Sequence, residues 1–110
     1  MRATTHLLGQ TFIVHAAIEQ PWIELVGIYL FASRRPGDDW SIHFVGHCGS
    51  VRTRLSGHTQ WPAAVQLGAT HVLTLAVSWP ANRELIAGSL IKLLQPVLNE
   101  HSCPYAAWVG

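Results

Sequence analysis

In the first half of the chain, apolar positions fall into runs that predict strands. Residues 11–18 are β-branched and apolar enough for a short strand, and the run VGIYLFA at residues 26–32 indicates a buried one. Residues 34–39 then supply the Pro, Gly and Asp of a turn. After this turn, apolar and polar residues alternate over residues 40–45 and stop at Gly46. The pattern predicts a β-hairpin.

Helical periodicity and capping residues dominate the second half. Ser50 is a suitable N-cap for a short helix over residues 50–57. A second short helix is expected over residues 61–67, followed by a β-branched strand over residues 70–78. An apolar stripe between two prolines predicts a longer helix over residues 80–95.

Together these elements predict an α/β protein of the α+β type, with a small mixed or antiparallel three-stranded sheet flanked by helices. A length of 110 residues suits one domain with a single core. We expect residues 1–110 to form that domain. Its core would span residues 26–99, with an N-terminal extension over residues 1–25 and a tail over residues 100–110.

Composition and charge restrict the partners. Hydrophobic residues make up 49% of the chain and charged residues 12%, so few charges are available to cover the surface. This composition is compatible with a homo-oligomer or a protein partner that covers exposed apolar surface. The net charge of +1 gives no overall attraction to nucleic acid. Any contact with DNA or RNA must therefore be local, for example at the paired arginines Arg52 and Arg54.

Cysteine and histidine spacing indicates neither a disulfide framework nor a zinc site. Cys48 and Cys103 lie far apart, and His43, His47 and His58 need not converge with Cys48. Roles at strand edges or in loops are favoured for these histidines. Because the sequence shows neither a standard signal peptide nor a membrane span, we expect a cytoplasmic protein without membrane contact.

Four blocks occur in an order that resembles the GIY-YIG nuclease superfamily. They are Gly27-Ile28-Tyr29 in the first hairpin strand, Phe44-Val45-Gly46 at the end of the second, the pair Arg54 and His58, and LIKLLQPVLN at residues 90–99. The segment WPAAVQLGATHVLTLAVS at residues 61–78 also resembles the corresponding segment of small single-domain bacterial members. The resemblance implies the fold of that superfamily.

The resemblance also implies a metal-dependent phosphodiesterase, in which a glutamate of the last helix holds Mg²⁺ or Mn²⁺. Tyr29 would assist activation of water, and Arg54 would stabilise charge on the phosphate. His58 would be an accessory acid, base or phosphate donor. Two family positions are altered, because Phe44 replaces the second tyrosine and Ala87 replaces the glutamate.

Both alterations argue against catalysis. Phenylalanine has no hydroxyl and an alanine methyl cannot bind a cation, so we expect activity to fall by several orders of magnitude. Glu84 lies on the same helical stripe one turn earlier and could supply a displaced carboxylate. A solvent-facing role near the helix start is favoured for Glu84. Nucleic acid would contact Arg52, Arg54, His58 and Asn99.

The sequence thus predicts a degenerate GIY-YIG endonuclease-like domain that binds DNA or RNA with little or no phosphodiesterase activity. One alternative is a protein-interaction or inhibitor module on the same scaffold, and another is a weak endonuclease that depends on a divalent metal. Tyr29 could equally be a core aromatic residue. Trp40 or Trp61 could stack on an unpaired base, although core and interface roles are more common for tryptophan.

Overall fold

The structure is a computed structural model that describes residues 3–16, 24–37 and 39–100. Its centre is a five-stranded sheet in which every pairing is antiparallel, in the order β1-β2-β5-β3-β4. The strands are β1 (Thr4–Leu7), β2 (Gln10–Ala16), β3 (Gly27–Arg35), β4 (Asp39–Cys48) and β5 (His71–Ala76). The helices are α1 (Val51–Leu55), α2 (Trp61–Gln66), α3 (Pro80–Leu94) and α4 (Val97–Glu100).

The predicted α+β class is confirmed, but the prediction of three strands is wrong. The N-terminal region is part of the sheet, because Ile13 to Ala16 of β2 pair with β5 and β1 pairs with β2. This pairing buries Phe12 completely and joins His15 to Thr74 through a 2.8 Å hydrogen bond. The hydrophobic pattern indicated β2 alone, and the predicted end of that strand at residue 18 lies outside the described residues.

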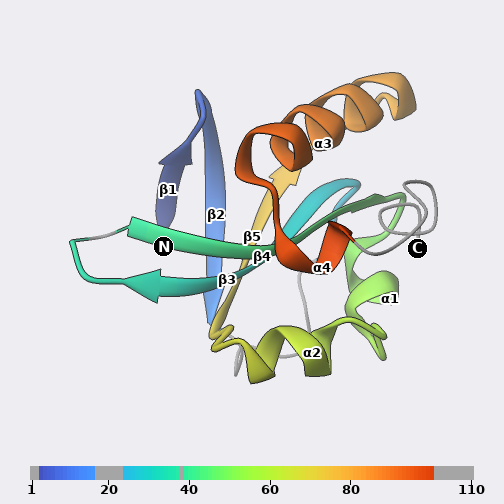
Figure 1. Cartoon of the computed structure of the whole chain (residues 1–110). Coiled ribbons are helices and arrows are strands. Elements are labelled where there is room, and N and C mark those ends of the chain that lie inside the picture. Colours follow the sequence, from blue (N-terminus) through green and yellow to red (C-terminus); the bar gives the residue numbers. More distant parts are fainter. Residues whose placement is uncertain (1–2, 17–23, 38, 101–110) are drawn as a thin grey trace.

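The sheet separates two cores (Figure 1). Side chains of β3 alternate between them, so that Tyr29 and Phe31 face α1 and α2, while Ile28 and Leu30 face α3. The α3 residues Ala87 and Leu90 are buried in this second core. Each face of the sheet therefore has its own set of helices and its own buried cluster.

A β-bulge interrupts the alternation in β4. Phe31 pairs with Phe44 and Ala32 pairs with Ile42, so the register passes over His43. Strict alternation would place Phe44 on the same face as Ile42 and Trp40, which contact the α3 core. The bulge turns Phe44 to the opposite face, beside Tyr29. The hairpin is as predicted, but its strands run further, to Arg35 and Cys48.

The helices α1, α2 and α3 begin within a residue of where the sequence predicts them. Ser50 caps α1, because its side chain accepts a hydrogen bond from the backbone N–H of Thr53. This helix ends at Leu55, before His58, because Gly57 adopts a φ of 77°. Part of the expected irregular tail is helical in α4, and residues 101–110 lie outside the described part of the chain. In the described ranges no helix has the length and apolar character required to cross a membrane.

Candidate functional site

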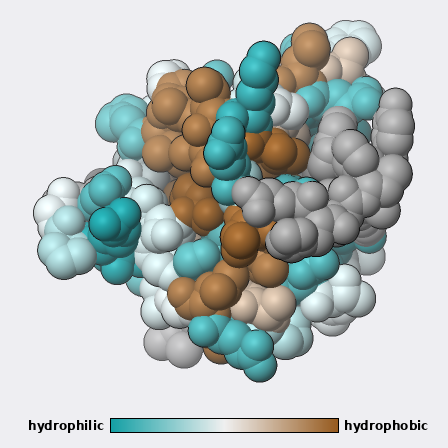
Figure 2. All heavy atoms as spheres, viewed as in Figure 1, coloured by the Kyte–Doolittle hydropathy of each residue, from teal (hydrophilic) through white to brown (hydrophobic). Residues whose placement is uncertain are grey.

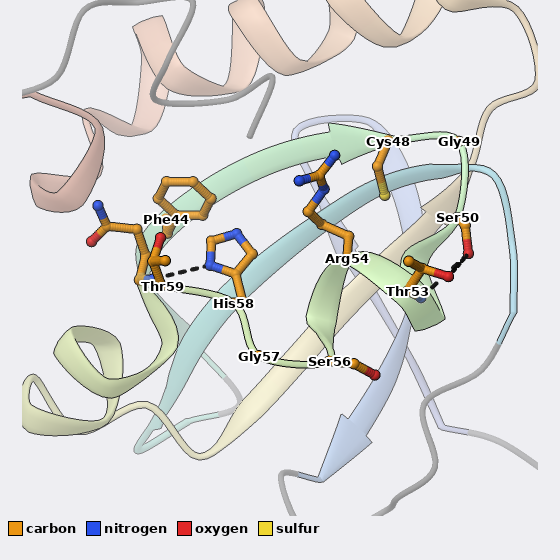
Figure 3. Close-up of a pocket in the computed structure, with 11 residues that line it drawn as sticks. Phe44, Cys48, Gly49, Ser50, Thr53, Arg54, Ser56, Gly57, His58 and Thr59 are labelled. Atoms are coloured by element: carbon orange, nitrogen blue, oxygen red, sulfur yellow. Dashed lines mark hydrogen bonds between the residues drawn. The ribbon is translucent and has the colours of Figure 1, made fainter.

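A pocket of about 430 Å³ lies between the end of β4, α1 and the loop that leads to α2 (Figure 3). Among the described residues, its lining includes one cationic side chain, four hydroxyl groups and no carboxylate. The lining residues are Phe44, Cys48, Gly49, Ser50, Thr53, Arg54, Ser56, Gly57, His58, Thr59 and Gln60. The candidate residues Arg54 and His58, predicted from the sequence, thus share one pocket.

Glu24 anchors one wall of this pocket, and no sequence pattern identified it. The Ser50 hydroxyl lies within 2.9 Å of both carboxylate oxygens of Glu24 and donates to that carboxylate. The same serine oxygen accepts from Thr53 as the helix cap, and the N–H of Val51 donates to the carbonyl of Leu25. The segment before β3 therefore fixes the start of α1.

Arg54 supplies the positive charge of the pocket. Its side chain is exposed and points toward β4, between His58 and Cys48 (Figure 3). Within the described residues its guanidinium forms no ion pair or hydrogen bond. Its charge lowers the pKa of His58 and opposes the burial that raises the pKa of the Cys48 thiol and of Tyr29. The charge of Arg54 therefore acts on His58, Cys48 and Tyr29, and the Glu24 carboxylate opposes it at Cys48.

His58 is held as a neutral ring. The backbone N–H of Gln60 donates to Nδ1 at 3.0 Å, so Nδ1 carries no proton. In the neutral ring the proton must then lie on Nε2, which is 2.8 Å from the Tyr29 oxygen and donates to it. Burial and the nearby Arg54 guanidinium lower the pKa of His58 to about 4. At neutral pH the ring therefore positions Tyr29 and cannot accept its proton.

Tyr29 lies beneath the pocket. Its side chain is 1% exposed, and burial raises the pKa of its hydroxyl well above the usual value. The rings of Phe31, Phe44 and Tyr29 surround His58, with centroids 5.0 to 5.5 Å from the imidazole. The ring of Phe44 packs against Phe31 and His58 in this cluster, and it has no hydroxyl group that could donate or accept a proton. Tyr29 is thus a buried core aromatic whose one polar atom contacts His58.

The other predicted site residues lie elsewhere. Arg52 is exposed on α1 but does not line the pocket, and Glu84 is exposed on α3, where its charge acts on His47. Ala87 is completely buried in the core on the α3 face, opposite Tyr29. A glutamate in place of Ala87 would therefore not face the pocket that holds Arg54, and Glu84 does not line this pocket.

Asn99 has a structural role. Its side-chain oxygen accepts from the Val45 N–H at 3.0 Å, and its side-chain nitrogen donates to the Val45 carbonyl at 3.1 Å. Both groups of this buried amide are engaged with β4, an edge strand of the sheet. Asn99 therefore satisfies edge-strand groups that would otherwise be left unpaired.

The pocket does not fit Mg²⁺ or Mn²⁺. Hard cations favour carboxylate ligands, and the oxygens of the described lining are hydroxyls, backbone carbonyls and the Gln60 amide beside a guanidinium charge. Nor do His43, His47, Cys48 and His58 form a transition-metal site: among described residues, no three histidine, cysteine or acidic side chains gather to hold an ion.

The donor set instead favours an anion. The Arg54 guanidinium and the Thr53 and Thr59 hydroxyls can donate hydrogen bonds to oxygens of a phosphate or carboxylate group. The Ser50 and Ser56 hydroxyls, in contrast, already donate to oxygens of the protein. Comparisons of the chain with protein-family models, with curated proteins and with solved structures gave no match.

Proposed function

We propose that this protein binds nucleic acid, as a degenerate member of the GIY-YIG nuclease superfamily, and holds a backbone phosphate at Arg54. The observation that carries the proposal is the composition of the pocket, which combines the Arg54 guanidinium with hydroxyl donors and, in the described part of the chain, has no lining carboxylate. A phosphodiester would accept hydrogen bonds from Arg54 and from the Thr53 and Thr59 hydroxyls, whereas the Ser50 hydroxyl donates to Glu24. The chain has little net charge, so the contact would be local.

The arrangement of the motif residues supports the link to the superfamily. The run Gly27-Ile28-Tyr29 lies on β3, and Phe44-Val45-Gly46 lies beside it on β4, with Tyr29 and Gly46 as register partners. Arg54 follows on α1 and faces the same side of the sheet as Tyr29. Phe44 and Arg54 thus line one pocket, and Tyr29 contacts it indirectly, through His58 and Phe44.

Binding without hydrolysis is favoured by the same geometry. The resemblance requires a carboxylate and a second tyrosine, whereas Ala87 is buried behind the sheet and Phe44 has no hydroxyl. His58 is neutral and donates to Tyr29, so neither side chain is placed to remove a proton from water at neutral pH. The residues that remain can bind and orient a phosphate.

The test is fluorescence anisotropy with labelled single-stranded DNA, duplex DNA and RNA over about 50 to 200 mM salt. We expect affinity to fall with salt, and Arg54→Ala to weaken binding and to reduce the slope of log K against log salt by about 1. The matched control is Arg35→Ala, which removes the same charge from an exposed position at the far end of β3. An equal loss in both variants, or no binding by the parent, would contradict the proposal.

A plasmid-nicking assay with Mg²⁺ or Mn²⁺ tests the second part. We expect no cleavage by the parent. Nicking that Arg54→Ala abolishes would overturn the binding-only proposal and would make Glu24 the carboxylate to examine, since it contacts Ser50 at the pocket wall. The variant Glu24→Gln would then lose activity.

A second candidate function, contact between two copies of this chain, is favoured by one surface feature. Leu85 and Leu93 of α3 are 70% and 66% exposed, and Leu8 at the tip of the β1–β2 hairpin is 50% exposed. These three leucines line a shallow hollow, and Figure 2 shows apolar residues gathered over the hairpin tip and α3. Light scattering should report a dimer that Leu85→Glu dissociates, and a monomeric parent would exclude this function.

A further inference from the structure

A second, smaller hollow adjoins the pocket that contains Arg54. Its volume is about 230 Å³, and Ser56, Gly57 and His58 line both spaces. Gly57 contributes no side chain to the boundary, and a β-carbon built there would have open space around it. A ligand held in one space can therefore continue into the other without meeting a side chain at Gly57.

The walls of the second hollow are aromatic and apolar. The rings of Trp61 and Phe31 make a T-shaped contact, with centroids 4.9 Å apart. Leu55, Pro62 and the three shared residues complete the lining. None of these residues carries a full charge at neutral pH, because the pKa of His58 is lowered to about 4. The first space thus suits an anion, and the adjoining space suits a flat, neutral ring.

This pairing matches the parts of one nucleotide. We propose that the hollow at Trp61 receives an unpaired base from the strand whose phosphate lies at Arg54, so that the protein selects single-stranded nucleic acid. The inference rests on the proposed function and adds to it the class of ligand. A sugar links phosphate and base within a nucleotide, and the shared wall at Ser56, Gly57 and His58 lies where that link would pass.

Strand selection follows from the geometry of stacking. In a duplex the bases are paired and stacked on each other, so a ring can enter a side pocket only after it leaves the helix. An unpaired strand presents its bases freely, and stacking on an aromatic side chain tolerates any base. The hollow therefore predicts little sequence preference and a clear preference for single strands.

The test compares two labelled oligomers that differ only in their bases, a thymidine decamer and the same backbone with abasic sites. Both oligomers carry the same phosphates. The difference between their affinities for the wild-type protein therefore measures the contribution of the bases. We expect the thymidine oligomer to bind roughly five- to a hundredfold more tightly, which is the range for stacking of one base on an aromatic side chain. The matching duplex should bind less tightly than the thymidine oligomer.

Substitutions then locate the base. Trp61→Leu keeps an apolar side chain and should remove the difference between the two oligomers, whereas Trp61→Phe should retain most of it. The control is Trp79→Leu, because Trp79 is 73% exposed at the start of α3 and does not line either space. It should leave both affinities unchanged.

The outcomes separate this inference from the proposed function. Equal binding of the two oligomers, with Arg54→Ala still weakening both, would overturn the base site and leave the phosphate site intact. Tighter binding of duplex than of the single strand would also overturn the base site. Binding of neither oligomer would overturn both proposals.

Discussion

The ring of Tyr29 lies over Gly46, its register partner on the neighbouring strand, and only a glycine leaves room for it. A β-carbon at Gly46 would overlap the phenolic oxygen and the ring carbon that bears it. Because the atoms of Tyr29 that it would overlap belong to a fully buried ring, the ring cannot move aside at little cost. The Gly46–Tyr29 contact thus fixes the phenol that His58 contacts.

We therefore expect Gly46→Ala to lower the free energy of unfolding by about 1 to 3 kcal/mol, as overpacking of a buried site does. Urea denaturation measures this loss. Gly88→Ala is the matched control, because Gly88 lies within α3 with open space around it and alanine is the better helix former there. It should raise stability by about 0.5 to 1 kcal/mol. Equal effects of the two substitutions would contradict the assigned contact.

Removal of the Asn99 amide should loosen β4. Asn99→Ala leaves the buried N–H and C=O of Val45 without their side-chain partners, at an expected loss of about 2 to 4 kcal/mol for two unsatisfied groups. The Val45 amide should also exchange its hydrogen faster. Asn99→Asp keeps the acceptor for the Val45 N–H but directs a carboxylate oxygen at the Val45 carbonyl, so it should not restore stability. Unchanged exchange at Val45 in Asn99→Ala would refute this role.

Ala87→Glu should destabilise the protein without creating a nuclease. The side chain of Ala87 is completely buried in an apolar core, and a carboxylate placed there is separated from the Arg54 pocket by the sheet. We expect a loss of about 3 kcal/mol or more in urea denaturation and a raised pKa for the new carboxyl. Glu84→Gln, on the exposed side of the same helix, should change stability by less than about 0.5 kcal/mol.

The double substitution Ala87→Glu with Phe44→Tyr extends this test to catalysis. It restores the residue types that the resemblance requires, and we expect no metal-dependent plasmid nicking from it, because the glutamate remains on the α3 face. Nicking by the folded double variant would show that the glutamate reaches the pocket.

Stability should fall as the pH is lowered through the range in which His58 titrates. The folded pKa of about 4 lies below the ordinary value of 6.5, so between these values the unfolded chain binds a proton that the folded chain does not. The contribution of His58 is complete above about pH 6.5 and is lost as the pH falls toward about 4. Urea midpoints at about pH 7.5 and about pH 4.5 measure the change.

His58→Gln isolates this contribution, because glutamine does not titrate. Burial also lowers the pKa values of His43 and His47, so the variant should keep part of the pH dependence and lose the share of His58. Parallel changes in parent and variant would indicate that His58 is solvated when folded.

Local sequence signals determined much of the backbone. Ser50 caps α1 because a serine oxygen can accept from the first free N–H groups of a helix, and this requires no distant partner. The prolines at α2 and α3 and the turn before β4 act through φ restrictions in the same local way. The candidate pair Arg54 and His58 was also identified from the sequence, through the motif spacing, and both residues line one pocket.

Only the tertiary structure decided which side chains meet. The bulge at His43 turns Phe44 toward Tyr29, although the alternating pattern of β4 contains no sign of it. Glu24 reaches Ser50 across 26 positions of sequence, and Asn99 reaches Val45 across 54. Ala87 stands where the resemblance expects a glutamate, yet it lies on the face of the sheet opposite Tyr29. Periodicity assigns a residue to an element, whereas strand register and helix placement assign it to a face, and these depend on packing between distant segments.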